Sequence, residues 1–180
     1  MIIIKNYVAD ALLTFTKMEK LVCMYKFYLI STFIFILDIL TKNYVQKRIE
    51  FGDKIEINSF ISFVHFQNPG AAFNFLSDQG GWQRFFLIGI SIFAIFYIPF
   101  LINQNRKNML IMLGLLLILG GALGNLYDRV LYGYVIDFIY LNIAEFYWPA
   151  FNIADSAISI GIILFIFGSL LNYKKLKRKA

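Results

Sequence analysis

The chain has 180 residues, of which 59% are hydrophobic and only 16% are charged. This apolar fraction exceeds that of a soluble domain and excludes a disordered segment, a coiled coil and an ordinary soluble enzyme. The single cysteine and single histidine exclude an internal disulfide and a multi-histidine metal site. The net charge of +6 comes from basic residues that flank apolar runs, which is typical of membrane topology and not of nucleic-acid binding.

Residues 1–25 are predicted to form a cytoplasmic extension ahead of the first apolar run. They lack the apolar core and the small-residue cleavage site of a removable signal peptide. Two interpretations remain open for this segment. It is either a dispensable extension or an amphipathic helix on the inner surface of the membrane.

Four apolar stretches are long enough, or nearly so, to cross a membrane. A hydrocarbon core of about 30 Å requires roughly 20 helical residues. The predicted spans are residues 27–45, 85–102, 109–127 and 152–173. Together, residues 26–173 form one predicted four-span domain, and residues 174–180 form a basic tail that contacts anionic lipid.

The charges beside these spans predict the orientation of the chain. Eleven basic and two acidic residues lie in the N-terminal segment, the loop around Arg106 and the tail. The opposite side has six basic and nine acidic residues. Because lysine and arginine accumulate on the cytoplasmic side, both termini are predicted to be cytoplasmic. Segments 43–84 and 128–151 then face outward.

The two outward segments carry patterns of their own. Residues 54–58 alternate between polar and apolar side chains, and the β-branched and aromatic run 60–66 ends at a turn signal, which predicts a small sheet on the membrane surface. In the second segment, aromatic residues predict an interfacial belt on a short surface helix. These aromatic residues are Tyr140, Phe146, Tyr147 and Trp148.

Polar side chains gather at the outward ends of the spans, where burial in lipid is costly. They are Asp38, Lys42, Asn125, Asp128, Arg129, Asp137, Asn152 and Asp155. Several are three or four residues apart and therefore share a helix face. The small residues 120–124 allow a neighbouring backbone to approach the third span closely. We expect these polar groups to converge on one cluster.

The residue types in this cluster favour acid–base chemistry by two carboxylates. His65 lies in an apolar strand pattern and is interpreted as a sheet residue, and no set of ligands for zinc is present. Asp128 is expected to form a structural ion pair with the adjacent Arg129. Asp137 and Asp155 lack a local basic partner, so they either share a proton as a catalytic pair or serve in capping and packing.

Five sequence blocks resemble those of the lipoprotein signal peptidase family, signal peptidase II. Three of them read GNLYDR at 124–129, VIDF at 135–138 and FNIADS at 151–156. The two earlier blocks read DILTK at 38–42 and NPGAAF at 68–73. The match covers about residues 27–173, with the blocks in order and sensibly spaced.

The resemblance implies a bacterial inner-membrane aspartyl endopeptidase that cleaves prolipoproteins before a diacylglyceryl-modified cysteine. Its fold would be membrane all-α, with four transmembrane helices, a small extracytoplasmic β-cradle and a short interfacial helix. The catalytic pair maps onto Asp137 and Asp155. The remaining site residues map onto Asp38, Lys42, Asn68, Gly124, Asn125, Asp128, Arg129, Asn152 and Ala154.

No metal and no cofactor are expected, and the chemistry requires only a monomer. The expected partners are the prolipoprotein substrate and membrane lipid, without nucleic acid. Two other classes remain as alternatives. Intramembrane carboxylates also mark proton relays in small transporters or channel subunits, and a scaffold could recognise lipoproteins without cleaving them.

Overall fold

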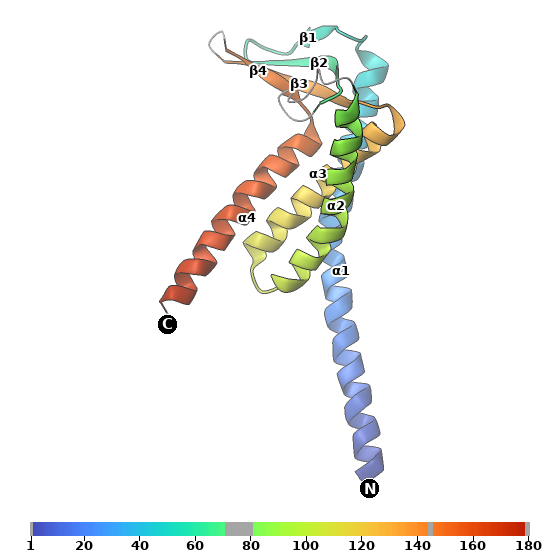
Figure 1. Cartoon of the computed structure of the whole chain (residues 1–180), viewed down its shortest axis with the longest axis vertical. Helices are drawn as coiled ribbons and strands as arrows, with labels where there is room; N and C mark the ends of the chain where they lie inside the picture. Colours follow the sequence, from blue (N-terminus) through green and yellow to red (C-terminus); the bar gives the residue numbers. More distant parts are fainter. Residues whose placement is uncertain (1, 71–80, 144–145, 179–180) are drawn as a thin grey trace.

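The computed structural model describes the backbone of residues 2–70, 81–143 and 146–178, and most side chains from Tyr25 onward. Within these ranges it contains four helices and four strands (Figure 1). The helices are α1 (Ile2–Arg48), α2 (Trp82–Gln104), α3 (Met109–Leu131) and α4 (Ile153–Lys177). The strands are β1 (Lys54–Glu56), β2 (Ile61–Asn68), β3 (Val135–Ile143) and β4 (Phe146–Phe151).

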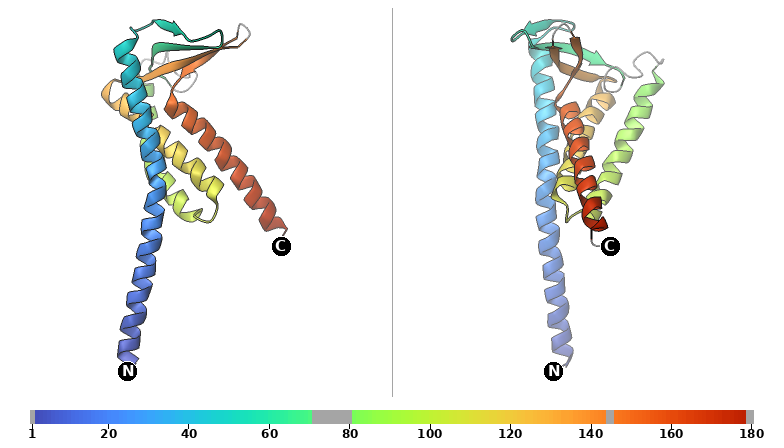
Figure 2. Two further views of the ribbon diagram at one scale, coloured as in Figure 1. Left: turned by 180° about the vertical axis from the view of Figure 1, so that it is seen from behind. Right: turned by 90° about the vertical axis from the view of Figure 1, so that its left-hand side faces the viewer.

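All four predicted membrane spans are helical. The long apolar segments within the helices are Tyr25–Arg48, Trp82–Gln104, Met109–Leu131 and Ile153–Lys177. Pro99 lies inside α2, which continues through it. Residues 2–24 extend α1 in line with the first span (Figures 1 and 2). The domain limit at residue 25 stays a prediction.

Helix α3 is the centre of the bundle, because it packs against α1, α2 and α4. Its glycines permit these close approaches. A Cβ atom at Gly120 would lie 2.7 Å from the Ser31 carbonyl oxygen on α1, and one at Gly114 would lie 2.6 Å from the Gly161 carbonyl oxygen on α4. The other three helices expose most of their apolar side chains, as expected for surfaces that face lipid. The predicted role of the small residues in α3 is therefore confirmed.

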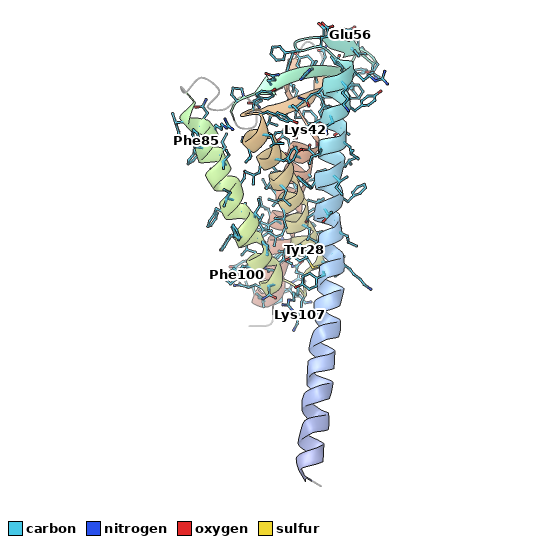
Figure 3. The ribbon with its side chains drawn as sticks, turned by 90° about the vertical axis from the view of Figure 1, so that its right-hand side faces the viewer. Tyr28, Lys42, Glu56, Phe85, Phe100 and Lys107 are labelled. Carbon is cyan, nitrogen blue, oxygen red and sulfur yellow. The ribbon has the colours of Figure 1, made fainter. Side chains whose placement is uncertain are left out.

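A four-stranded antiparallel sheet caps one end of the bundle, in the order β1-β2-β3-β4. We call this the sheet end. Both chain termini lie away from it (Figure 1). Lys42 lies just below the sheet, whereas Tyr28, Phe100 and Lys107 lie at the opposite, distal end (Figure 3). The predicted surface sheet is thus confirmed and has two strands more than the sequence patterns indicated.

The predicted short interfacial helix is wrong for the second outward segment. Its residues pair as the antiparallel strands β3 and β4, with Leu141 opposite Trp148. Two properties of the sequence explain the outcome. Aromatic residues favour strands, and Pro149 lacks the amide hydrogen that a helix interior or a central strand requires. Since β4 is an edge strand, it tolerates this proline.

The sheet is attached to the end of α1. Val45 on α1 and Ile49, directly after its end, form a small buried cluster with Phe138 on β3. His65 lies in β2, as predicted, and its Nδ1 atom is 2.9 Å from the Ile49 carbonyl oxygen. These contacts hold β2 and β3 over the helix ends that carry the polar cluster.

Candidate active site

The first turn of α4 brings two of the predicted site residues together. Asn152 is the N-cap, and its side-chain oxygen accepts a hydrogen bond of 2.8 Å from the Asp155 backbone N–H. The Asp155 carboxylate in turn accepts a bond of 3.3 Å from the Asn152 backbone N–H. This is a capping box, in which each side chain satisfies a backbone donor that the helix leaves unpaired. The capping interpretation of Asp155 is therefore confirmed, although it does not exclude a second role.

Asp137 comes from β3 and reaches the same place. Its two carboxylate oxygens accept hydrogen bonds of 2.7 Å from Asn152 Nδ2 and 2.9 Å from Asn68 Nδ2. The side chain is almost completely buried. Burial first, and then the nearby charge of Asp155, raise the pKa of Asp137 to about 7. A carboxyl with this pKa can hold or release a proton near neutral pH.

Asn152 connects the two carboxyl groups, since its side chain donates to Asp137 and its backbone donates to Asp155. Asp155 receives a further bond of 2.8 Å from Asn125 Nδ2 on α3. Two asparagine amides therefore point their NH₂ groups at the two carboxyl groups. Asp137 from β3 and Asp155 from α4 are therefore linked to each other through Asn152.

A buried lysine sets the orientation of one of these amides. Lys42 Nζ donates to Asn125 Oδ1 at 3.1 Å and forms ion pairs with Asp38 at 2.6 Å and Asp128 at 2.9 Å. Because the lysine occupies the oxygen of Asn125, the NH₂ group of that amide is turned toward Asp155. Lys42, Asp38 and Asp128 are each about 2% exposed or less. A charged cluster this deep is stable only when its members are paired.

The two acids of this cluster also fix the backbone of the site. Asp38 Oδ1 accepts a bond of 2.9 Å from the Ala154 N–H at the start of α4. Asp128 Oδ2 accepts one of 3.1 Å from the Ile136 N–H, next to Asp137 on β3. Gly124 lies against the Asp38 carboxylate and has no room for a side chain. These contacts hold the backbone immediately before Asp137 and immediately before Asp155.

The expected ion pair between Asp128 and Arg129 is wrong. Asp128 pairs with Lys42 instead, because neighbouring residues on a helix point in directions about 100° apart and do not face each other. Arg129 turns the other way and donates from Nη2 to the Gly70 carbonyl oxygen at 2.7 Å. Among the described residues, its buried Nε has no hydrogen-bond partner.

A cleft of about 470 Å³ opens beside this cluster between the helices. Its polar end is formed by Asn125, Arg129 and Asp155. Asp137 is not among its lining residues, and neither is Asn152, which links Asp137 to Asp155 by hydrogen bonds. The remaining walls come from α2, α3, α4 and β4, and include Leu87, Ile90, Ser91, Ala94, Ile118, Ala122, Trp148, Pro149 and Ser159. The cleft is therefore mainly apolar and reaches the acid pair at one end.

The structure brings the eleven predicted site residues to one end of the bundle, and their individual roles stay predictions. Residues 71–73 of the second sequence block lie outside the described residues. Sequence patterns did not indicate that Trp148 and Pro149 line the cleft; Trp148 was predicted to lie in an interfacial belt, and Pro149 was given no role. Nothing in their local sequence indicates this, because the strand pairing of β4 decides it.

Comparison with known proteins gives the family. A sequence model of signal peptidase (SPase) II matches residues 30–171. The lipoprotein signal peptidase of Janthinobacterium sp. (strain Marseille) is 45% identical over 141 residues, which are 78% of this chain and 86% of that protein. The lipoprotein signal peptidase of Teredinibacter turnerae is 46% identical over 156 residues, which are 84% and 91% of the two chains.

The chain belongs to the signal peptidase II family. It is an aspartyl peptidase that removes signal peptides from prolipoproteins. The fold agrees, since a solved bacterial membrane enzyme superposes with a TM-score of 0.76 at 34% identity, covering 83% of this chain and 90% of its own. A second solved bacterial membrane enzyme superposes with a TM-score of 0.70 at 35% identity, covering 81% of this chain and 92% of that chain. The family, the activity and the membrane fold predicted from the sequence blocks are confirmed, and this signal peptidase II is a multi-pass membrane protein.

Proposed function

We propose that Asp137 and Asp155 are the catalytic pair of this peptidase and that they cleave the bond before a diacylglyceryl-modified cysteine. The observation that carries the proposal is the position of Asn152, which donates to both carboxyl groups. Two carboxyl groups this close share a proton, because ionising both is costly in a buried site. One of them can then take a proton from water while the other gives one to the scissile carbonyl oxygen.

The water oxygen bonds to the scissile carbonyl carbon and forms a tetrahedral intermediate. When this intermediate collapses, the bond to the cysteine nitrogen breaks and the nitrogen leaves with a proton from the acid pair. Donors near the pair favour the charge that develops on the carbonyl oxygen. The buried Arg129 Nε, which has no partner in the described part of the chain, is one available donor.

The cleft fits a substrate that arrives through the membrane. Its walls are mainly apolar, and most of them are contributed by three of the helices that are long and apolar enough to cross a membrane. The signal segment of a prolipoprotein is apolar and already lies in the bilayer, so it enters sideways without leaving lipid. The two acyl chains on the cysteine stay in lipid, and only the scissile peptide reaches the polar end.

The orientation follows from charge. The positive-inside rule places both termini in the cytoplasm and the sheet end at the outer face of the bacterial inner membrane. The arrangement of the chain supports this, since both termini lie away from the sheet (Figure 1). The acid pair and the cleft come from a single chain, so a monomer contains the complete site.

The test uses the purified full-length protein and a diacylated prolipoprotein, with the shortened product detected by mass. We expect Asp137→Asn and Asp155→Asn each to abolish cleavage while the protein still inserts and folds. Asp53→Asn, at an exposed carboxyl near β1, is the matched control and should cleave normally. Turnover in either dyad variant would refute the assignment of the pair. A parent protein that binds the substrate without shortening it would instead support the scaffold alternative.

A further inference from the structure

Arg84 connects two helices at the sheet end, although no sequence block singles it out. It lies in the first turn of α2, and its Nε donates to the Arg129 carbonyl oxygen at 2.9 Å. Its Nη2 donates to the Val130 carbonyl oxygen at 3.1 Å. Both carbonyls belong to the last turn of α3, where a helix leaves its acceptors unpaired and carries partial negative charge. The guanidinium therefore satisfies two acceptors of α3 from a different helix.

The same guanidinium packs on the turn that leads into β3. Gly133 occupies this turn with a φ of +88°, a conformation that favours glycine. A Cβ atom at Gly133 would lie only 3.1 Å from Arg84 Nη1. Arg84 thus touches both the end of the helix that carries Arg129 and the turn four residues before Asp137.

At this end α2 also carries the buried Gln83, whose side-chain oxygen accepts a hydrogen bond of 2.8 Å from the Gly81 N–H, but no buried hydrophobic residue of the helix lies in this half. Its buried hydrophobic residues, Ile98 and Ile102, lie in the distal half and pack into the core of the bundle. Toward the sheet end α2 leans away from the other helices (Figures 2 and 3), and Phe85 and Phe86 are exposed. Leu87, Ile90 and Ser91 in this half form a wall of the cleft. The position of that wall therefore depends on what fastens the sheet end of α2.

We propose that Arg84 is a positioning residue that tethers the outward-leaning sheet end of α2 to the last turn of α3 and so sets the width of the substrate cleft. The inference rests on the proposed function, because it takes the cleft as the entry site of the signal segment. Within the described part of the chain, the Arg84 side chain donates to α3 carbonyl oxygens and not to Asp137 or Asp155, and it does not line the cleft. Its loss should consequently weaken substrate binding and leave the chemical step almost unchanged.

The kinetic test is Arg84→Met, which keeps the length of the side chain and removes its donors. We expect KM to rise about five- to tenfold, in line with the loss of two charge-assisted hydrogen bonds at a half-buried site, and kcat to stay within about twofold. Arg84→Lys should give a smaller rise, since an ammonium cannot bridge two carbonyls as a planar guanidinium does. Arg106→Met, at an exposed arginine of the distal loop, is the control.

A purely structural role predicts a different result. If Arg84 only stabilised the fold, the variants would contain fewer active molecules, which lowers kcat and leaves KM unchanged. The second measurement is the distance between nitroxide labels at Phe86 on α2 and Ile163 on α4, both exposed, in a Cys23→Ser background. We expect Arg84→Met to lengthen and broaden this distance distribution.

A KM within twofold of the parent, or an unchanged distance distribution, would overturn the proposal. This result can be told apart from a failure of the proposed function, because the cleavage activity of the parent protein is measured before that of the variant. A parent that does not cleave refutes the function, whereas a parent that cleaves beside an Arg84→Met variant with the same KM refutes only the role of Arg84.

Discussion

The acid pair should make the folded protein less stable as the pH rises. Asp137 is almost fully buried, and its pKa lies at about 7 instead of the ordinary 3.8. The folded protein therefore holds this proton more tightly than the unfolded chain does. Stability that depends on the proton is fully present below the unfolded pKa and is lost as the pH rises through about 7.

The size of the effect follows from the two pKa values. At pH 5 the folded protein keeps the proton, and at pH 8 it has lost most of it, whereas the unfolded chain is ionised at both. The difference in linkage free energy between these two pH values is about 2–3 kcal/mol, at about 1.36 kcal/mol for each unit of pKa. Asp137→Asn cannot ionise, so it should lose this pH dependence.

The substitution also disturbs hydrogen bonds, because Asp137 accepts from both Asn68 and Asn152. An asparagine offers one acceptor oxygen to these two donors, which costs about 1–3 kcal/mol. This cost is similar at pH 5 and pH 8 and cancels from the difference between them. The comparison of two pH values thus isolates the proton from the hydrogen bonds.

The assay is unfolding in mixed micelles at pH 5 and pH 8, for the parent, Asp137→Asn and the control Asp53→Asn. We expect the parent and the control to lose about 2–3 kcal/mol more than Asp137→Asn over this interval. Asp137→Asn should thus be inactive, and its stability relative to that of the parent should be higher at pH 8 than at pH 5. This combination is expected when the parent must keep a costly buried charge on Asp137 at pH 8. Equal pH dependence in all three proteins would mean that the folded protein does not hold the Asp137 proton more tightly than the unfolded chain does.

Three further predictions concern the surroundings of the pair. Lys42→Met leaves Asp38 and Asp128 buried without a cation, so it should destabilise the protein by about 3–5 kcal/mol in the same unfolding assay, whereas Lys175→Met in the tail should not. Gly124→Ala places a methyl group against the Asp38 carboxylate and should lower the unfolding free energy by about 1–3 kcal/mol, with a matching loss of cleavage. Cleavage should persist after dialysis against a chelator; loss of cleavage that one divalent ion restores would contradict an acid pair acting alone.

Much of the architecture is determined by local properties of the sequence. An apolar run of about 20 residues has few options other than a membrane helix, because the backbone must satisfy its own hydrogen bonds in lipid. The four predicted spans are accordingly found as helices. Once their order is known, Asp38, Asn125 and Asp155 must lie at the same end of the bundle.

The partners of the charged groups were decided only by the tertiary structure. Asp128 pairs with Lys42, which is far away in sequence, and not with the adjacent Arg129. The pairing depends on how far α1 and α3 are rotated about their axes and on how closely Gly124 lets them approach. Helix rotation and separation are properties of packed surfaces, and a local sequence window does not contain them.

Long-range packing, and not local sequence, also explains why the second outward segment forms strands and why the two acids meet. The run from Val135 to Phe151 became a hairpin because β3 found a partner in β2, a strand from a distant part of the chain. That pairing also carries Asp137 to Asn68 and Asn152. The order of the spans is enough to bring two acids without local partners to one end of the bundle. Only long-range packing decided that they meet around one asparagine, because burial and strand register depend on residues that are remote along the chain.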